Sequence, residues 1–259
     1  MVPPRGVPSS GGLAPASRAL GDVKIDADNG GHQESTEQMA RFDGHYFEWS
    51  ARRIEAIIDW YGGDWFRDKR VLEVGAGYGD IGLAFWQLGA DVTWTEGRKE
   101  HVDVLRQRLS MVPAERIMLL DAEGGLKLPE GTPRFDLVVH LGLLYHLDEW
   151  RPSLIDAAEM APFMVLETEV CDSSDPSVEV KVEEHDGYDQ ALHGTGSRPS
   201  AEMIEGVMAG AGLHYQRLAD DRCNASIHVY DWPVTNSKQW KDGQRRWWWC
   251  GRESIRPTR

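Results

Sequence analysis

The chain has 259 residues, of which 41% are hydrophobic and 27% are charged, and it carries a formal net charge of −14 at pH 7. This length and apolar content suffice for one α/β domain with terminal extensions. So acidic a surface repels polyanions over most of its area, which disfavours an extended nucleic-acid interface.

The cysteines and the hydropathy indicate the cellular compartment that we expect for the protein. Cys171, Cys223 and Cys250 are odd in number and far apart, so they predict neither a disulfide framework nor a zinc site. We therefore expect a reducing, cytoplasmic location. No apolar run approaches 18 residues, and we expect no membrane span.

The N-terminal part divides into two predicted segments. Residues 1–31 are rich in Pro, Gly, Ser and Ala and lack the apolar core of a secretory signal, which predicts a flexible tail. Residues 32–69 form a predicted helical cap, because apolar residues recur at helical spacing between Gly44 and Phe66. Tyr46 and its aromatic neighbours either cover a binding pocket as a lid or pack as ordinary core.

The most informative segment follows this cap. An apolar run over residues 71–74 predicts a buried strand, and Gly75, Gly77 and Gly79 come directly after it. Residues 81–88 then show the apolar periodicity of a helix. Glycines at such a turn permit positive φ and let a ligand lie against bare backbone, beside the unpaired N–H groups of the helix.

The acid in front of this turn indicates which nucleotide-like cofactor it binds. Glu73 lies two residues before the first glycine, where its carboxylate would repel a pyrophosphate. A carboxylate instead stabilises a cationic ligand with a free amino group. This favours S-adenosylmethionine over a dinucleotide, although a generic glycine-rich turn with an incidental glutamate is the alternative.

Acids also end the next predicted strands. Residues 91–96 form a strand that ends at Glu96, 21 residues after Gly75, close to the offset at which an acid meets ribose hydroxyls. Residues 117–122 form a third strand, in which Asp121 can accept a hydrogen bond from an adenine amino group. A fourth strand over residues 135–140 ends at His140. Alternating strands and helices predict βαβ units and a parallel sheet.

These ordered motifs resemble class I S-adenosylmethionine-dependent methyltransferases over roughly residues 70–232. The resemblance implies a Rossmann-like, three-layer α/β/α sandwich with a mostly parallel seven-stranded sheet whose last strand is antiparallel. Candidates for strands five to seven are residues 163–169, 213–219 and 225–231. The implied cofactor-binding residues are Glu73, Gly75, Ala76, Gly77, Gly79, Glu96, Gly97, Asp121, Ala122 and His140.

A narrower resemblance concerns the segment after strand four. Residues 141–147 (LGLLYHL), Leu166-Glu167-Thr168 and a helix opened by Pro199-Ser200 are similar to the tRNA wobble-uridine carboxymethyltransferase and its relatives. That enzyme has a longer N-terminal extension and basic surfaces. The resemblance therefore implies a shared catalytic scaffold, not a shared substrate.

Methyl transfer to a hydroxyl or to a protonated amine requires a base. His146 is the first candidate, because it follows strand four on the side facing the cofactor and titrates near neutrality. His140 is the second candidate, and Tyr145 is placed to orient the acceptor. The polar segment 179–198 is the expected substrate loop, and the predicted substrate-binding residues are Tyr46, Tyr145, Glu169, His193 and Arg198. The histidines and glutamates of this region do not have the compact spacing of metal ligands, so no metal site is predicted.

Residues 233–259 form a predicted Trp/Arg-rich extension. Its tryptophans either pack on the domain or at a homodimer contact, or they form a stacking and phosphate-binding surface with the arginines. The leading functional prediction is methyl transfer to an O or N acceptor of a small molecule. The alternatives are methyl or carboxymethyl transfer to an RNA nucleoside, and a non-catalytic protein that binds S-adenosylmethionine.

Overall fold

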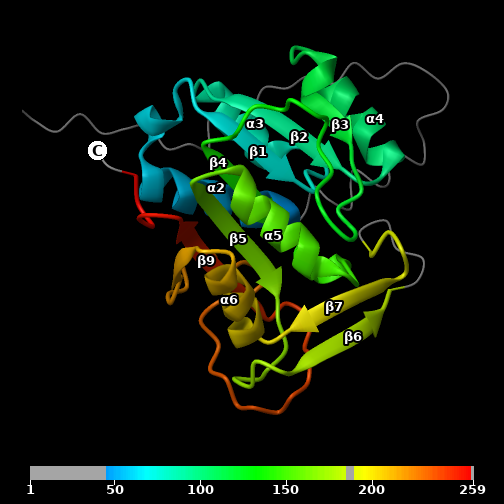
Figure 1. Ribbon diagram of the computed structural model, residues 1–259, viewed down its shortest axis with the longest axis vertical. Coiled ribbons are helices and arrows are strands. Elements are labelled where there is room, and N and C mark those ends of the chain that lie inside the picture. The colour runs from blue at the N-terminus through cyan, green and yellow to red at the C-terminus, as the bar shows by residue number, and fades with distance from the viewer. Residues whose placement is uncertain (1–44, 185–189, 258–259) are drawn as a thin grey trace, which may run out of the picture.

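The structure is a computed structural model that describes residues 45–184 and 190–257. The predicted tail and the first part of the predicted cap lie outside these residues. A seven-stranded sheet with the order β3-β2-β1-β4-β5-β9-β8 forms the centre of the described part (Figure 1). Its strands are β1 (Arg70–Val74), β2 (Asp91–Glu96), β3 (Ile117–Leu119), β4 (Leu137–Leu141), β5 (Phe163–Glu169), β8 (His214–Arg217) and β9 (Arg245–Gly251).

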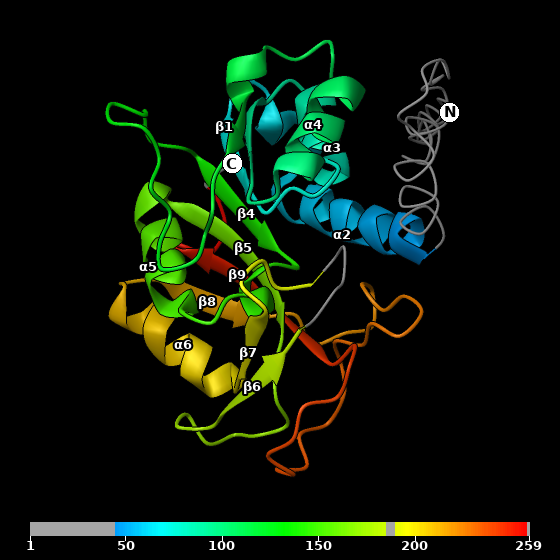
Figure 2. The same ribbon diagram turned by 90° about the vertical axis from the view of Figure 1, so that its right-hand side faces the viewer.

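Helices cover both faces of this sheet (Figure 2). The helices are α2 (His45–Tyr61), α3 (Asp80–Gln87), α4 (Lys99–Arg108), α5 (Trp150–Met160) and α6 (Ala201–Gly210). Side chains of α2, α3 and α4 belong to one apolar cluster, and those of α5 and α6 belong to another. Successive residues of β1 alternate between the clusters, with Val71 in the first and Leu72 in the second, because side chains of a strand point to opposite faces. The predicted three-layer α/β/α architecture is confirmed.

The strand directions also agree with the prediction. The pairs β1–β2, β1–β4, β2–β3 and β4–β5 are parallel, whereas β9 is antiparallel to β5. The carboxyl ends of β1, β2 and β4 therefore meet at one edge, where ligands bind in open parallel sheets.

The predicted position of the last strand is wrong. Residues 225–231 form only isolated bridges, and the antiparallel strand is β9, inside the segment that was predicted to be an extension. Trp247 and Trp249 enter one apolar cluster while Trp248 enters the other. The sheet thus continues beyond residue 232, and these three tryptophans fill the core instead of forming a surface that stacks bases.

The polar segment 179–198 is also more regular than predicted. Its two ends pair as antiparallel strands, β6 (Glu179–Glu183) and β7 (Thr195–Pro199). Ser200 then caps α6, since its side-chain oxygen accepts a hydrogen bond from the Met203 N–H.

Among the described residues, none of the helices has both the length and the apolar character needed to cross a membrane.

Candidate functional site

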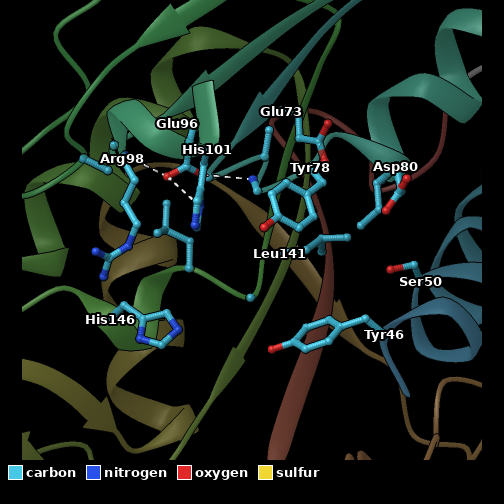
Figure 3. Close-up of a pocket in the computed structure, with 18 of the residues that line it drawn as sticks. Tyr46, Ser50, Glu73, Tyr78, Asp80, Glu96, Arg98, His101, Leu141 and His146 are labelled. Carbon is cyan, nitrogen blue, oxygen red and sulfur yellow. Dashed lines mark hydrogen bonds and ion pairs between the residues drawn. The ribbon is translucent and has the colours of Figure 1, made fainter. Parts of the chain in front are cut away.

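A cavity of about 400 Å³ lies at the carboxyl ends of β1, β2 and β4, next to α2. Figure 3 shows Glu73 and Glu96 on one side of it and His146 and Tyr46 on the other. Eight of the ten predicted cofactor residues line this cavity: Glu73, Gly75, Ala76, Gly77, Glu96, Gly97, Asp121 and Ala122. His146, Tyr145 and Tyr46 also line it.

The three glycines of the turn have different roles, although all have positive φ. A Cβ added to Gly77 would meet no atom within 4 Å, so this residue presents bare backbone to the cavity. A Cβ on Gly75 would lie 2.7 Å from Leu143. A Cβ on Gly79 would lie 2.5 Å from Leu105 of α4. Gly79 does not line the cavity, and its lack of a side chain serves helix packing instead of cofactor contact.

Glu73 lies between the sheet and the start of α3. One of its carboxylate oxygens accepts a hydrogen bond of 2.9 Å from the Gly82 N–H. Burial raises the pKa of Glu73 to about 8, although the Gly82 hydrogen bond lowers it. Burial therefore disfavours the ionised form of Glu73, and a cation in the cavity would stabilise that form.

Glu96 is fixed at the end of β2 by backbone donors. Its two carboxylate oxygens accept hydrogen bonds of 2.9 Å from the N–H groups of Gly77 and Arg98. Burial acts to raise the pKa of Glu96, but His101 and these N–H groups outweigh it, and the pKa is lowered. Glu96 is thus an ionised, pre-oriented acceptor suited to hydroxyl groups.

Asp121 meets the hairpin connection at the rim of the cavity. Its Oδ2 lies 2.6 Å from His193 Nε2, so His193 contacts Asp121 but does not itself line the cavity. Leu192, next in sequence, does line the cavity and would lie 3.3 Å from a Cβ on Gly97. Leu192 and His193, which precede β7, therefore border the side of the cavity that Asp121 and Gly97 form.

His146 is paired with Glu184 of the hairpin, at 2.6 Å between Nδ1 and Oε2. Burial acts to raise the pKa of Glu184, but the His146 hydrogen bond and the Arg198 charge outweigh it and lower the pKa to about 2. An ionised carboxylate only accepts hydrogen bonds, so Nδ1 of His146 carries a proton and Nε2 is the ring nitrogen that Glu184 does not engage. This is the geometry of a histidine base held by a carboxylate.

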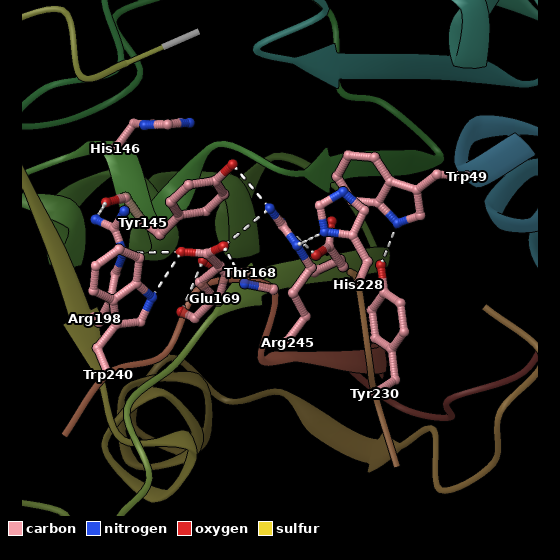
Figure 4. A network of polar contacts seen from close by, with 12 residues as sticks. Trp49, Tyr145, His146, Thr168, Glu169, Arg198, His228, Tyr230, Trp240 and Arg245 are labelled. Atoms are coloured by element: carbon pink, nitrogen blue, oxygen red, sulfur yellow. Dashed lines mark hydrogen bonds and ion pairs between the residues drawn. The ribbon is translucent and has the colours of Figure 1, made fainter. Parts of the chain in front are cut away.

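Tyr145 is held in place by Arg245 of β9. Its hydroxyl accepts a hydrogen bond of 3.0 Å from Arg245, which also bonds to Glu167 at 2.9 Å (Figure 4). Burial raises the pKa of the Tyr145 phenol, so the group stays protonated and can donate a hydrogen bond. Its ring centroid lies 3.9 Å from that of His146.

Besides Gly79 and His193, three predicted site residues do not line the cavity. His140 is fully buried on the face of the sheet covered by α5 and α6, and burial lowers its pKa to about 4, so it is a weak base without access. Glu169 accepts hydrogen bonds from Arg198, Trp240 and Arg245. Arg198 forms ion pairs with Glu169 and Glu184. None of these three side chains lines the cavity, and their contacts with cofactor or substrate stay predictions.

Sequence reasoning missed two residues of the site. Glu184 was one of several acids in a polar segment, and only the pairing of β6 with β7 brings it to His146. Arg53 of α2 lines the cavity, but along the helix it is one of two adjacent arginines. The helical spacing of the apolar positions was the only signal that separated the inward Arg53 from the outward Arg52.

No protein-family model and no curated protein sequence matches the chain. Among solved structures, the N-terminal domain of EvdMO1 with SAH bound has a TM-score of 0.57 and 23% identity, over 78% of this chain and 80% of that one. An S-adenosylmethionine-dependent methyltransferase from Clostridium acetobutylicum has a TM-score of 0.52 and 11% identity, over 84% and 96%. The chain therefore has the fold of S-adenosylmethionine-dependent methyltransferases.

Proposed function

We propose that the protein is an S-adenosylmethionine-dependent methyltransferase that methylates a hydroxyl group of a small molecule. The observation that carries this proposal is the pairing of His146 with Glu184 at the cavity that the glycine turn borders. A histidine whose Nδ1–H is held by a carboxylate can take a proton at Nε2, and a hydroxyl acceptor must lose its proton during transfer.

The residues of the cavity fit the cofactor. Gly77 leaves the backbone bare, and the buried Glu73 lines the cavity, where it would face the cationic end of the cofactor. Glu96 would hold the ribose hydroxyls and Asp121 the adenine amino group. The cavity of about 400 Å³ falls within the range of small-molecule sites.

The chemistry then divides between the cofactor and this chain. S-adenosylmethionine supplies a methyl group on a sulfonium, which is displaced in line by a nucleophile. Tyr145 and Tyr46 border the space next to His146 and would orient the acceptor, with Tyr145 donating a hydrogen bond. His146 Nε2 would accept the hydroxyl proton, and Glu184 would stabilise the imidazolium that forms. Positioning of this kind supplies much of the acceleration in bimolecular reactions.

The acceptor class follows from these groups and from one comparison. Aromatic rings with hydroxyl tips suit a sugar or a phenol, whose faces stack and whose hydroxyls donate and accept hydrogen bonds. The EvdMO1 domain, 22% identical, has a structure in the presence of SAH and D-fucose, which supports including sugars among the acceptors tested.

The test is calorimetric titration with S-adenosylhomocysteine. Glu96→Ala should weaken binding by about 1–3 kcal/mol, because the ribose loses hydrogen bonds to a charged acceptor. Glu100→Ala, on the exposed face of α4, is the matched control and should bind like the wild type. Wild-type protein that fails to bind would refute the proposed cofactor, and a Glu96 variant that binds equally well would refute the contact of Glu96 with the ribose.

Glu73 gives this binding a pH dependence. Its pKa is about 8 in the folded protein, and a bound ammonium favours the ionised carboxyl, so it lowers that pKa. Affinity for S-adenosylhomocysteine should therefore rise as the pH rises toward about 8, by up to about tenfold for each unit by which the pKa falls. Calorimetry near pH 7 in buffers of different ionisation enthalpy should detect proton release on binding. Glu73→Gln should abolish both effects; retention of either would contradict this role.

A further inference from the structure

Aromatic side chains line the side of the cavity that holds His146. We call this part the acceptor side and define it by four lining residues: Tyr46, Phe47, Tyr145 and His146. The Tyr46 ring points from α2 toward His146 (Figure 3). The ring centroids of Tyr145 and His146 lie 3.9 Å apart. The space beside the proposed base is therefore bordered by rings from two separate segments of the chain.

The Tyr46 ring is supported from within the protein. Its centroid lies 5.5 Å from that of Trp49. The Trp49 ring is in turn covered by the stacked His228 ring at 3.9 Å and by the Arg53 guanidinium at 3.5 Å. Tyr46 is thus the last ring of a packed row, and a flat ligand ring would extend that row into the cavity.

Phe47 adds an open apolar surface next to Tyr46. It lines the cavity, yet the residue is 54% exposed. Exposed apolar surface in a cavity favours ligands with an apolar face, because binding removes both surfaces from water. The acceptor side therefore favours a molecule with an apolar, planar part.

The charged side chains of the cavity already have partners. Three arginines line it, and each donates to an oxygen of the protein: Arg53 to Glu167, Arg98 to Gln190 and Arg108 to Asp80. Of the carboxylates among the described lining residues, Asp80 alone is not assigned to the cofactor, and Arg108 pairs with it. These pairings favour a neutral acceptor over an acidic or a cationic one.

Few hydrogen-bonding groups of the acceptor side face a ligand. Trp49 donates its indole N–H to Tyr230 at 2.7 Å and so offers the cavity only apolar surface. Tyr145 can donate its hydroxyl proton, and His146 has the ring nitrogen that Glu184 does not engage. A sugar carries hydroxyls around its whole ring, and those buried against Phe47 would lack partners. A phenol has one hydroxyl on a flat apolar ring.

The acidity of the acceptor leads to the same choice. A phenolic hydroxyl has a pKa of about 10, as in tyrosine, far below that of a sugar hydroxyl. Because the arginines of the cavity are paired, little positive charge is available to stabilise the alkoxide of a weaker acid. A phenol therefore needs the least help beyond a single base.

We infer that the acceptor is a neutral phenol whose ring lies against Phe47 and Tyr46, with its hydroxyl directed at His146. This inference names the acceptor class and rests on the proposed function. The phenol oxygen forms a bond to the methyl carbon while the bond from that carbon to the sulfonium breaks, and the electron pair of the broken bond stays on sulfur. The phenol proton passes to His146 Nε2 and is later lost to water. The products are an aryl methyl ether and S-adenosylhomocysteine.

The experiment compares matched acceptors with S-adenosylmethionine as donor and mass spectrometry as readout. The phenols are para-cresol and a naphthol. Their saturated analogues keep the hydroxyl and the approximate size but lose the flat ring, and D-fucose represents the sugars. We expect kcat/KM for the better phenol to exceed that for its saturated analogue and for D-fucose at least about tenfold.

Two variants test the aromatic contact. Phe47→Ala should raise KM for the better phenol roughly 3- to 10-fold, the effect expected for loss of one ring contact, with kcat within about twofold. Met111→Ala is the matched control, because Met111 is also 54% exposed but does not line the cavity, and it should match the wild type. Titration with S-adenosylhomocysteine should give both variants wild-type affinity, which also shows that they are folded.

The outcomes separate the acceptor class from the proposed function. Methylation of D-fucose or of a saturated analogue as efficiently as of the phenols would overturn the inference. The same holds for protein that binds S-adenosylhomocysteine but methylates neither phenol, and for an unchanged KM in Phe47→Ala. Wild-type protein that does not bind S-adenosylhomocysteine would instead refute the proposed function.

Discussion

His146→Ala should lower kcat for methyl transfer by about 10²- to 10⁴-fold, the usual contribution of a general base. The loss is expected because Nε2 is the proton acceptor that the Glu184 pairing leaves free at the cavity. Affinity for S-adenosylhomocysteine should stay within about twofold of the wild type, since His146 lies across the cavity from Glu96 and Glu73 (Figure 3).

The measurement requires an acceptor, which mass spectrometry of a library of hydroxylated sugars and phenols can supply. The rates of the wild type and of His146→Ala should then be compared with this acceptor. His214→Ala, on an exposed strand position, is the matched control and should retain the wild-type rate. A His146→Ala rate within about threefold of the wild type would show that the acceptor needs no base. An amine that is already neutral is such an acceptor.

The cofactor half of the cavity could be predicted from the sequence because its residues are close together in each βα unit. Gly77 and Glu96 lie at the ends of two adjacent parallel strands, and the pairing of β1 with β2 brings those ends side by side. Periodicity therefore predicts which strand ends meet, and the residue type at each end indicates the chemistry.

The other half could not be predicted in this way because its contacts join distant segments. Glu184 reaches His146 only through a hairpin that packs against the turn after β4, and Arg245 reaches Tyr145 from 100 positions along the chain. Glu169 and Arg198 have the residue types of a substrate site, yet they bind each other. Residue type alone does not distinguish an ion pair beneath a site from a group exposed within it.

The misplaced last strand has the same origin. Arginines at residues 245 and 246 gave the segment the composition of a charged surface. In the structure Arg246 donates to the backbone oxygens of Tyr230 and Trp232, and Arg245 is enclosed by carboxylates, so both charges are buried with partners. From composition alone, a buried strand with arginines is not distinguished from a charged, exposed extension. The distinction requires the positions of the groups that pair with the arginines.

Arg245→Met should destabilise the folded protein by about 3–5 kcal/mol, because removing one member of a buried ion pair leaves an uncompensated charge. Arg245 contacts Glu167 at 2.9 Å and Glu169 at 3.3 Å, and the side chains of both glutamates are at most 2% exposed. The Arg245 side chain also donates to Tyr145 and to His228 Nδ1, each at 3.0 Å (Figure 4). The expected fall in Tm is roughly 6–20 °C for a domain of this size.

Urea and thermal unfolding measure this effect, and a second substitution identifies its cause. If the unpaired charge is responsible, Arg245→Met combined with Glu167→Gln should recover part of the lost stability, since the amide has no charge to compensate. Arg222→Met, which removes an exposed arginine paired with Asp220, should change the stability little. If the double variant were less stable than the single one, packing and not charge would dominate at Arg245. In that case the arginines of β9 would act mainly through their aliphatic stems, and Tyr145 would not depend on them for its orientation.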